Sequence, residues 1–113
     1  MISYSQAEIL RLMRAIRRAS RSNLPVDSSF IPFDILLNLL QFHQENQPVS
    51  IKTLFASLPY SDMGVRYHFR RLVKNGWVKL EQSPFDSRSK ICVPTEKLLS
   101  SFSSITLELS KFR

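Results

Sequence analysis

The sequence predicts a mainly α-helical domain with one small β-hairpin. Apolar residues recur three and four positions apart in five segments, and each segment begins close to a serine, threonine or proline that favours a helix start. Two short runs of strand-forming residues, separated by a polar stretch, predict the hairpin. With 113 residues and 43% apolar content, the chain has the size and the core of a single domain, residues 1–113.

The first helix is predicted over residues 5–22. Ser5 and Glu8 have the spacing of a capping box, in which each side chain accepts a hydrogen bond from the other residue's backbone N–H. One face of this helix is apolar and consists of Ile9, Leu12, Met13, Ile16 and Ala19. The opposite face is cationic and consists of Arg11, Arg14, Arg18 and Arg21. A polar linker around Pro25 follows.

The core unit is predicted over residues 32–94. Pro32 suits the first turn of a second helix, which is apolar on almost every side and is therefore expected to be buried, in part by a second subunit. Ser50 is the expected cap of a short third helix, and Ser61 is the expected cap of a fourth. Because only a tight turn separates the third and fourth helices, they predict a helix-turn-helix.

The hairpin and the last helix complete the chain. Gly76 ends the fourth helix, and the runs Trp77–Leu80 and Ile91–Val93 are the predicted strands. A last helix, capped by Thr95, is predicted over residues 95–112. Its apolar residues are spaced four, three, four and three positions apart, as in a helix–helix contact. These residues are Leu98, Phe102, Ile105, Leu109 and Phe112.

The chain is strongly basic. Sixteen Lys and Arg against nine Asp and Glu give a net charge of +7 and a pI near 10.1. Such a charge suits binding to a nucleic acid, an anionic membrane surface or an acidic protein. The longest apolar run is too short to cross a bilayer, and the N-terminus lacks the apolar core of a signal peptide, so we expect a cytoplasmic protein without a membrane partner.

No pattern of residues predicts an enzyme, a metal site or a cofactor. The acidic residues are scattered, the two histidines stand at unrelated positions, and two glycines are too few for a phosphate-binding loop. The lone cysteine, Cys92, cannot form an internal disulfide. With no basic residue placed to activate it, a structural role is favoured over redox sensing.

The fourth helix has one apolar face and one cationic face. The apolar face consists of Val65, Phe69, Leu72 and Val73. The outward stripe consists of Met63, Tyr67, Arg70 and Lys74, flanked by Arg66 and Arg71. Arg71 and Lys74 stand further along the helix, where they suit phosphate contacts. The alternative is a basic face that contacts only water.

The outward stripe has the chemistry that reads the major groove of DNA. Arg66 or Arg70 would bind a guanine edge, and Met63 and Tyr67 would contact the thymine methyl group. Gly64 lies on the same half of the helix surface, and we expect it to let the backbone approach a neighbour closely. The helix is therefore predicted to be a recognition helix.

Three motifs stand in register, beginning at the end of this helix. Leu72–Gly76 has the pattern Leu-x-x-x-Gly, Asp86–Lys90 contains Asp-x-Arg, and Pro94–Lys97 stands where the last helix begins. Over about residues 33–98 the chain resembles the MarR family of transcription regulators. The resemblance implies a winged helix-turn-helix, in which the hairpin is the wing and the flanking N- and C-terminal helices form a dimer.

The resemblance also implies roles in the wing. Arg88 stands at the position of the arginine that enters the minor groove, where a narrow groove concentrates negative potential. Asp86 is expected to orient Arg88 through a charge-assisted hydrogen bond. Ser61, Gly64 and Lys90 complete the residues expected to contact DNA. The alternative is an ordinary polar hairpin tip.

Two functions remain open. The first is a sequence-specific, double-stranded DNA-binding transcription regulator that is a homodimer and reads a near-palindromic operator. The second is a winged-helix module that binds an acidic protein without sequence-specific DNA recognition. The expected dimer interface combines the last helix's spaced residues, given above, with Ile9, Leu12, Met13 and Ile16. A small-molecule effector, found for some regulators, is not identified by any motif.

Overall fold

The structure is a computed structural model that describes residues 3–26 and 28–112, without the side chain of Phe112. Within this part of the chain it contains five α-helices and one small antiparallel sheet, which confirms the predicted fold class. The elements are α1 (Gln6–Asn23), α2 (Ile31–Gln44), β1 (Val49–Ser50), α3 (Ile51–Ala56), α4 (Asp62–Lys74), β2 (Val78–Gln82), β3 (Lys90–Pro94), α5 (Glu96–Leu109) and a 3-10 turn, η1 (Ser110–Phe112).

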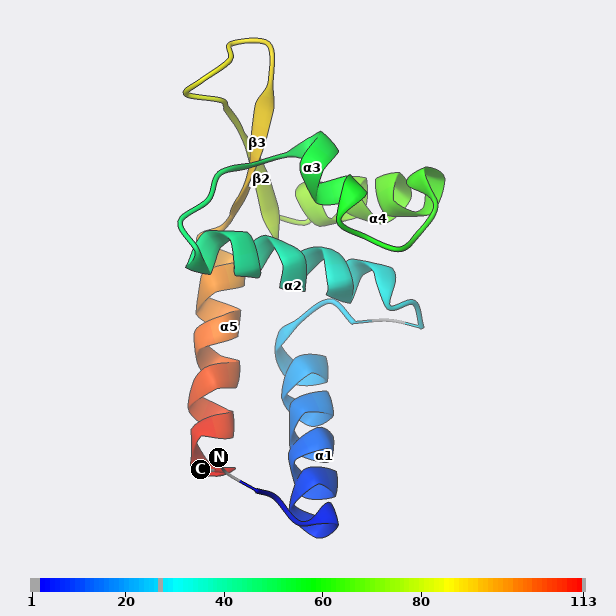
Figure 1. Cartoon of the computed structure of the whole chain (residues 1–113), viewed down its shortest axis with the longest axis vertical. Coiled ribbons are helices and arrows are strands. Elements are labelled where there is room, and N and C mark those ends of the chain that lie inside the picture. The colour runs from blue at the N-terminus through cyan, green and yellow to red at the C-terminus, as the bar shows by residue number, and fades with distance from the viewer. Residues whose placement is uncertain (1–2, 27, 113) are drawn as a thin grey trace.

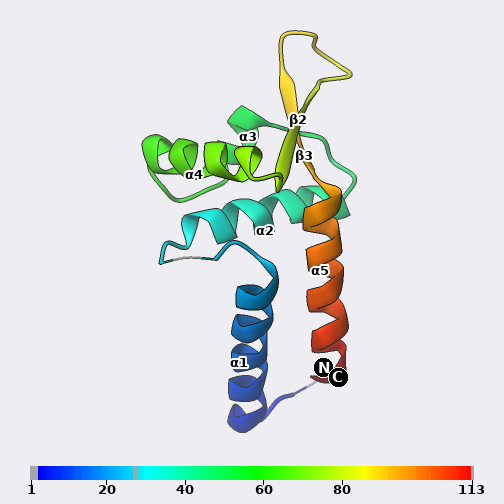
Figure 2. The same cartoon turned by 180° about the vertical axis from the view of Figure 1, so that it is seen from behind.

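The molecule has two ends of different construction. Helices α1 and α5 lie side by side at one end, and we call this pair the arm (Figures 1 and 2). Helix α2 crosses the middle, and α3, α4 and the sheet occupy the other end, with the β2–β3 hairpin projecting farthest from the arm. We call residues 31–94 the winged half. The principal axes measure 50 × 28 × 25 Å.

The predicted helix starts are confirmed. Ser5 and Glu8 form a complete capping box, with the Glu8 backbone N–H donating to Ser5 Oγ at 3.2 Å and the Ser5 backbone N–H donating to Glu8 Oε1 at 3.1 Å. Ser50, Ser61 and Thr95 each accept a hydrogen bond from the backbone N–H three residues later. These caps fix where four of the five described helices begin, and α2 begins instead with Pro32 in its first turn.

The sheet has a third strand that the sequence did not predict. Strand β1 pairs with β3, which places Val49 opposite Cys92, while β2 pairs with the other edge of β3, where Leu80 is opposite Cys92. The hairpin strands run one or two residues closer to the loop than predicted, up to Gln82 and from Lys90. Backbone pairing therefore continues past the residues whose side chains are buried.

Helix α2 forms the centre of the core. Ile35, Leu36 and Leu39 are almost completely buried, and α2 contacts α3, α4 and β3. A single chain therefore covers most of this helix, and partial cover by a second subunit stays a prediction. Leu37 is the partly exposed exception among its leucines.

The arm corrects the prediction for the last helix. Leu98 and Ile105, expected at the dimer interface, are buried inside the same chain, because α5 packs against α1 and β3 of its own subunit. Phe102 and Leu109 are only half-buried and remain partly accessible. The side chain of Phe112, also expected at the interface, lies outside the described part of the chain.

Candidate nucleic-acid interface

Helix α4 is held firmly against the rest of the winged half. Val65, Phe69 and Leu72 are buried on its inner face. The ring of Phe69 packs edge-on against Phe55 of α3, with 5.2 Å between the ring centroids. The hydroxyl of Tyr60, in the turn before α4, donates a hydrogen bond to Asp34 of α2, and this bond raises the pKa of Tyr60 above its ordinary value. The position of α4 is thus set by two neighbouring helices.

The end of α4 is joined to the wing and to α5. Gly76 has a φ of +81°, a left-handed conformation that side chains disfavour, so the glycine of the Leu-x-x-x-Gly pattern is required by the backbone. Thr95 Oγ1 donates to the Gly76 carbonyl at 2.6 Å, and Lys97 Nζ donates to the Asn75 carbonyl at 2.9 Å. Lys97 also lies 4.3 Å from the centre of the Trp77 ring. These contacts fix α4 relative to the strands.

The outward stripe of α4 faces solvent. Met63 is 82% exposed and Tyr67 is also exposed, although both are large apolar-bodied side chains. Among the described residues, Arg70 and Lys74 form no ion pair or side-chain hydrogen bond, and both are exposed. Two unpaired cations that follow two exposed apolar-bodied side chains on one helix face suit a polyanion that also offers apolar contacts.

Two further arginines of α4 already have partners on the same helix. Arg66 Nη2 lies 2.8 Å from Asp62 Oδ2, in an exposed ion pair one turn apart. Arg71 donates to the Tyr67 hydroxyl at 3.5 Å, with its guanidinium 5.7 Å from the centre of that ring. Arg66 must leave Asp62, or share it, before it reads a base. Arg70 needs no such rearrangement and is the stronger candidate for base contact.

Ser61 and Gly64 serve the helix start. Ser61 Oγ accepts from the Gly64 backbone N–H at 3.2 Å, so its predicted DNA contact would compete with capping. A Cβ atom on Gly64 would lie 3.2 Å from Ser61 Oγ and 3.3 Å from Ile31 Cδ1 of α2. The close neighbour that Gly64 admits is therefore α2. The expected contact of Gly64 with DNA stays a prediction.

An open groove runs between α3, α4 and β2. Its volume is about 680 Å³, and its walls include Arg66 and Arg70 of α4 together with Phe55, Phe69 and Leu80. Lys52 of α3 lies on the same groove and adds a third cation. Lys52 was not predicted from the sequence, because a single lysine in a six-residue helix gives no pattern.

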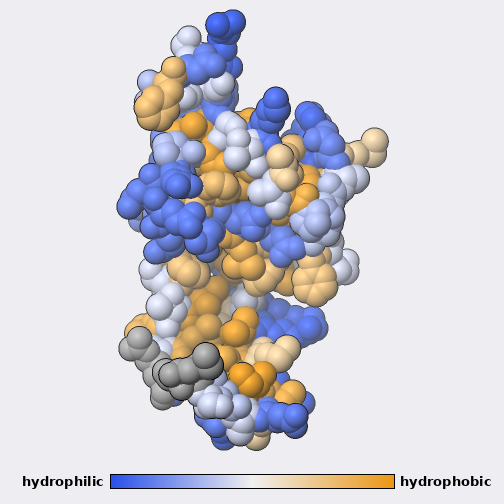
Figure 3. Space-filling view, in the orientation of Figure 1, coloured by the Kyte–Doolittle hydropathy of each residue, from blue (hydrophilic) through white to orange (hydrophobic). Residues whose placement is uncertain are grey.

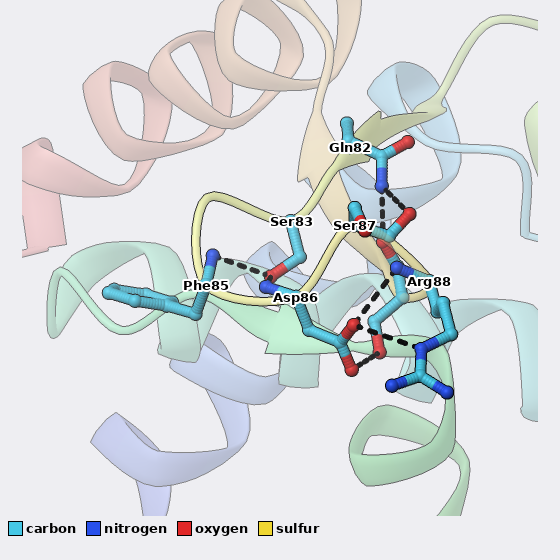
Figure 4. A network of polar contacts seen from close by, with 7 residues as sticks. Gln82, Ser83, Phe85, Asp86, Ser87 and Arg88 are labelled. Atoms are coloured by element: carbon cyan, nitrogen blue, oxygen red, sulfur yellow. Dashed lines mark hydrogen bonds and ion pairs between the residues drawn. The ribbon is translucent and has the colours of Figure 1, made fainter.

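The wing tip is organised around two side chains (Figure 4). Ser83 Oγ accepts from the backbone N–H groups of Phe85 and Asp86 at 3.1 and 3.2 Å. Asp86 Oδ1 accepts from the Arg88 backbone N–H at 2.9 Å, and Asp86 Oδ2 accepts from Ser89 Oγ at 3.2 Å. The loop therefore has a fixed shape although its side chains face solvent.

The role expected for Asp86 needs correction. Its carboxylate lies 4.0 Å from Arg88 Nε, which is too long for a hydrogen bond, and the Arg88 side chain is 95% exposed. Asp86 positions Arg88 mainly through the backbone of the turn. Lys90, the first residue of β3, is also exposed and forms no ion pair among the described residues. The wing thus presents unpaired Lys90 and loosely paired Arg88 beside a hydrogen-bonded loop.

The arm carries an exposed apolar surface. Met13 is 61% exposed, and Ile9 and Ile16 are partly exposed, while Leu12 is half-buried. Leu107 of α5, which was not predicted, is 76% exposed. Hydrophobic residues gather over α1 and α5 in the lower part of Figure 3. Such a surface is typical of a protein–protein contact.

The thiol of Cys92 is buried and poorly suited to act as a nucleophile. It is buried within the sheet, and burial raises the pKa of its thiol to about 12. The thiol is therefore protonated near neutral pH, whereas nucleophilic cysteines depend on the thiolate. In the described part of the chain, no three His, Cys, Asp or Glu side chains are grouped as metal ligands. None of the described helices combines the length and apolar character needed to cross a membrane.

Comparison with known proteins identifies the fold. No protein-family model and no curated protein matches the sequence. Among solved structures, a transcriptional regulator from Thermotoga maritima is similar, with 21% identity, a TM-score of 0.67, and coverage of 92% of this chain and 68% of that chain. A MarR-like transcriptional regulator from the same organism has 23% identity and a TM-score of 0.63, with coverage of 97% and 79%. S. aureus MepR bound to ethidium bromide has 18% identity and a TM-score of 0.64, with coverage of 96% and 79%.

These likenesses confirm the predicted resemblance at the level of the fold. The similarity spans the arm as well as the winged half, since more than nine-tenths of the chain is covered in each case. The arrangement is that of MarR-like winged-helix proteins, with α3 and α4 as the helix-turn-helix and β2–β3 as the wing.

Proposed function

We propose that the protein is a sequence-specific, double-stranded DNA-binding transcription regulator. The observation that carries this proposal is the outward stripe of α4, where exposed Met63 and Tyr67 are followed, one turn further along, by the unpaired cations Arg70 and Lys74. The wing, with exposed Arg88, projects from the same half of the molecule. The similarity to transcriptional regulators supports the same function.

The proposed complex places α4 in the major groove. Arg70 would donate two hydrogen bonds to a guanine edge, and Met63 would contact a thymine methyl group. Lys74, near the end of α4, would contact a phosphate and contribute affinity without sequence preference. Arg88 would enter the adjacent minor groove, whose negative potential is strongest where A·T pairs narrow it.

The proposed active form is a homodimer joined through the arm. The exposed side chains of Ile9, Met13 and Ile16, together with Leu107, would be covered by the same surface of a second copy. Two recognition helices related by a twofold axis then lie about one DNA turn, roughly 34 Å, apart. The operator is therefore expected to be near-palindromic.

Selection from a pool of random duplexes tests the proposal, because it finds a binding site even when the operator sequence is not known. The selected duplex is then titrated with wild type and with the double variant Arg70→Ala, Arg88→Ala. Removing one base contact and one minor-groove contact should weaken binding about a hundredfold, since each such contact contributes about 1–3 kcal/mol.

The matched control is the double variant Arg14→Ala, Arg18→Ala. It removes the same charge from exposed positions of α1, in the arm. Its affinity should stay close to that of wild type. Equal losses in both double variants would show that DNA binding depends only on the net charge of the protein. If wild type selects no duplex at all, the protein is instead the winged-helix module for an acidic protein partner.

A further inference from the structure

Phe85 is an aromatic residue at the wing tip that has no role in the interface proposed above. Its side chain is 85% exposed, the highest value among the large hydrophobic residues described. Single exposed apolar side chains are common on protein surfaces and need no explanation. Phe85 differs from an ordinary case because of where it lies and how it is held. It stands three residues before Arg88 on the part of the molecule that projects farthest.

The backbone of Phe85 is fixed. Its N–H donates to Ser83 Oγ at 3.1 Å, and Pro84 before it has a restricted backbone. The loop is closed by a second hydrogen bond, in which the Ser83 N–H donates to the Ser89 carbonyl at 3.1 Å. Gln82 Nε2 donates to the Ser87 carbonyl across the base of the loop. A side chain presented on such a turn loses little backbone freedom when it binds.

Phe85 and Arg88 leave the tip in different directions. Figure 4 shows the Phe85 ring extending to one side of the loop and the Arg88 guanidinium to the other. Among the described residues, the Phe85 ring has no aromatic or cation partner. The tip therefore presents an exposed aromatic ring and a guanidinium group on different sides of the loop. The two groups could contact different positions along one DNA groove.

We propose that Phe85 is a minor-groove wedge, which inserts its ring at a base step next to the site of Arg88. This inference rests on the proposed DNA-binding function. Phenylalanine is one of the apolar side chains that proteins insert between base pairs from the minor groove, where it unstacks a step and kinks the duplex. Arg88 anchors the wing electrostatically, and Phe85 adds a preference for steps that unstack at low cost, such as pyrimidine–purine steps.

The test uses a duplex selected by wild type from a random pool, carrying the fluorescent base 2-aminopurine at successive positions of the flank that the wing contacts. Wild type should raise the fluorescence at one step in each half-site, because unstacking relieves quenching. Phe85→Ala should abolish this rise and weaken binding about tenfold, since a buried phenylalanine ring is lost. Phe85→Leu, which keeps an apolar wedge, should retain most of both effects.

Two further variants separate the wedge from its surroundings. Phe85→Ala should leave the salt dependence of binding unchanged because it removes no charge, whereas Arg88→Ala should lower the slope by about one unit. Phe30→Ala removes another exposed phenylalanine, which lies outside the wing at the start of α2, and should leave the fluorescence rise intact.

The outcomes distinguish this inference from the function on which it rests. Duplex binding by wild type without a rise at any step would overturn the wedge and leave the proposed function standing. The same holds if Phe85→Ala retains the full rise. Failure of wild type to select any duplex would overturn both.

Discussion

The winged half and the arm bury their apolar residues to different extents. In the winged half, Leu36, Leu54 and Val65 are almost completely buried within one chain, and the exposed side of α4 is mostly cationic. In the arm, α1 and α5 cover only one side of each other. Met13 and Leu107 are left largely exposed there, although both are large and apolar.

This difference assigns separate tasks to the two halves. A helix pair that leaves a wide apolar surface in water is incomplete as a folding unit, whereas α2 of the winged half already packs against α3, α4 and β3. We infer that one chain is sufficient to shape the proposed DNA-binding surface. Under the proposed function, two chains are needed to place two such surfaces on one operator.

The largest effect is expected in the core of the winged half. Leu36→Ala removes a side chain that is 0% exposed, so it should lower the free energy of unfolding by about 2–5 kcal/mol. The neighbouring Leu37 is 41% exposed, and Leu37→Ala should cost about 1 kcal/mol or less. Urea denaturation followed by circular dichroism measures both. Equal losses would contradict the different burial of these two leucines.

A smaller but more specific effect is expected in the arm. Met13→Glu together with Ile16→Glu places two charges on the exposed apolar surface and should convert the proposed dimer into monomers. Each subunit keeps its DNA-facing residues, yet affinity for a palindromic duplex should fall about a hundredfold, because the second half-site is no longer linked to the first. Sedimentation velocity and duplex titration measure the two losses separately.

The control adds the same charge elsewhere. Gln44 and Gln47 are exposed near the end of α2, and their change to Glu should leave the oligomeric state unaltered. A wild-type protein that sediments as a monomer at micromolar concentration would contradict the dimer. The apolar surface of the arm would then belong to a contact with another protein.

The helix boundaries were predictable because short-range contacts set them. Ser50, Ser61 and Thr95 each cap a helix through a hydrogen bond to a residue three positions later, which the sequence displays directly. Strand β1 was missed because two residues are too few for an alternating pattern. It exists only because β3, with Cys92 opposite Val49, returns to the same place.

What covers each face could not be predicted in the same way. Periodicity shows that Leu98 and Met13 lie on apolar faces, but only the packing shows that the first is buried by its own chain and the second is not. Gly64 likewise signals a close neighbour without identifying it as Ile31. Phe85 left no signal, because one apolar residue in a polar loop has no period.

The cationic residues of the two halves should also differ in how much they contribute to the salt dependence of DNA binding. Lys74→Ala should lower the slope of log affinity against log salt concentration by about one unit, since one phosphate contact is lost. Arg14→Ala removes an equal charge from the arm and should leave the slope unchanged. Titration of one duplex at several salt concentrations checks this. A decrease of the same size for Arg14 would show that DNA contacts extend along α1.

The smallest effect concerns the start of the arm. Hydrogen bonds from the Ser5 backbone N–H and the Ser5 side chain lower the pKa of Glu8 below its ordinary value. A carboxylate with a lowered pKa stabilises the fold above the ordinary pKa of Glu, about 4.3, and this contribution is lost as pH falls through the lowered value.

Glu8→Gln keeps the capping geometry but cannot ionise. Wild type should therefore melt at a slightly higher temperature than Glu8→Gln at about pH 7, and the two melting temperatures should converge in acid. The difference should be small because Glu8 is exposed. A difference that stays constant across the pH range would mean that the charge of Glu8 contributes nothing to the capping box.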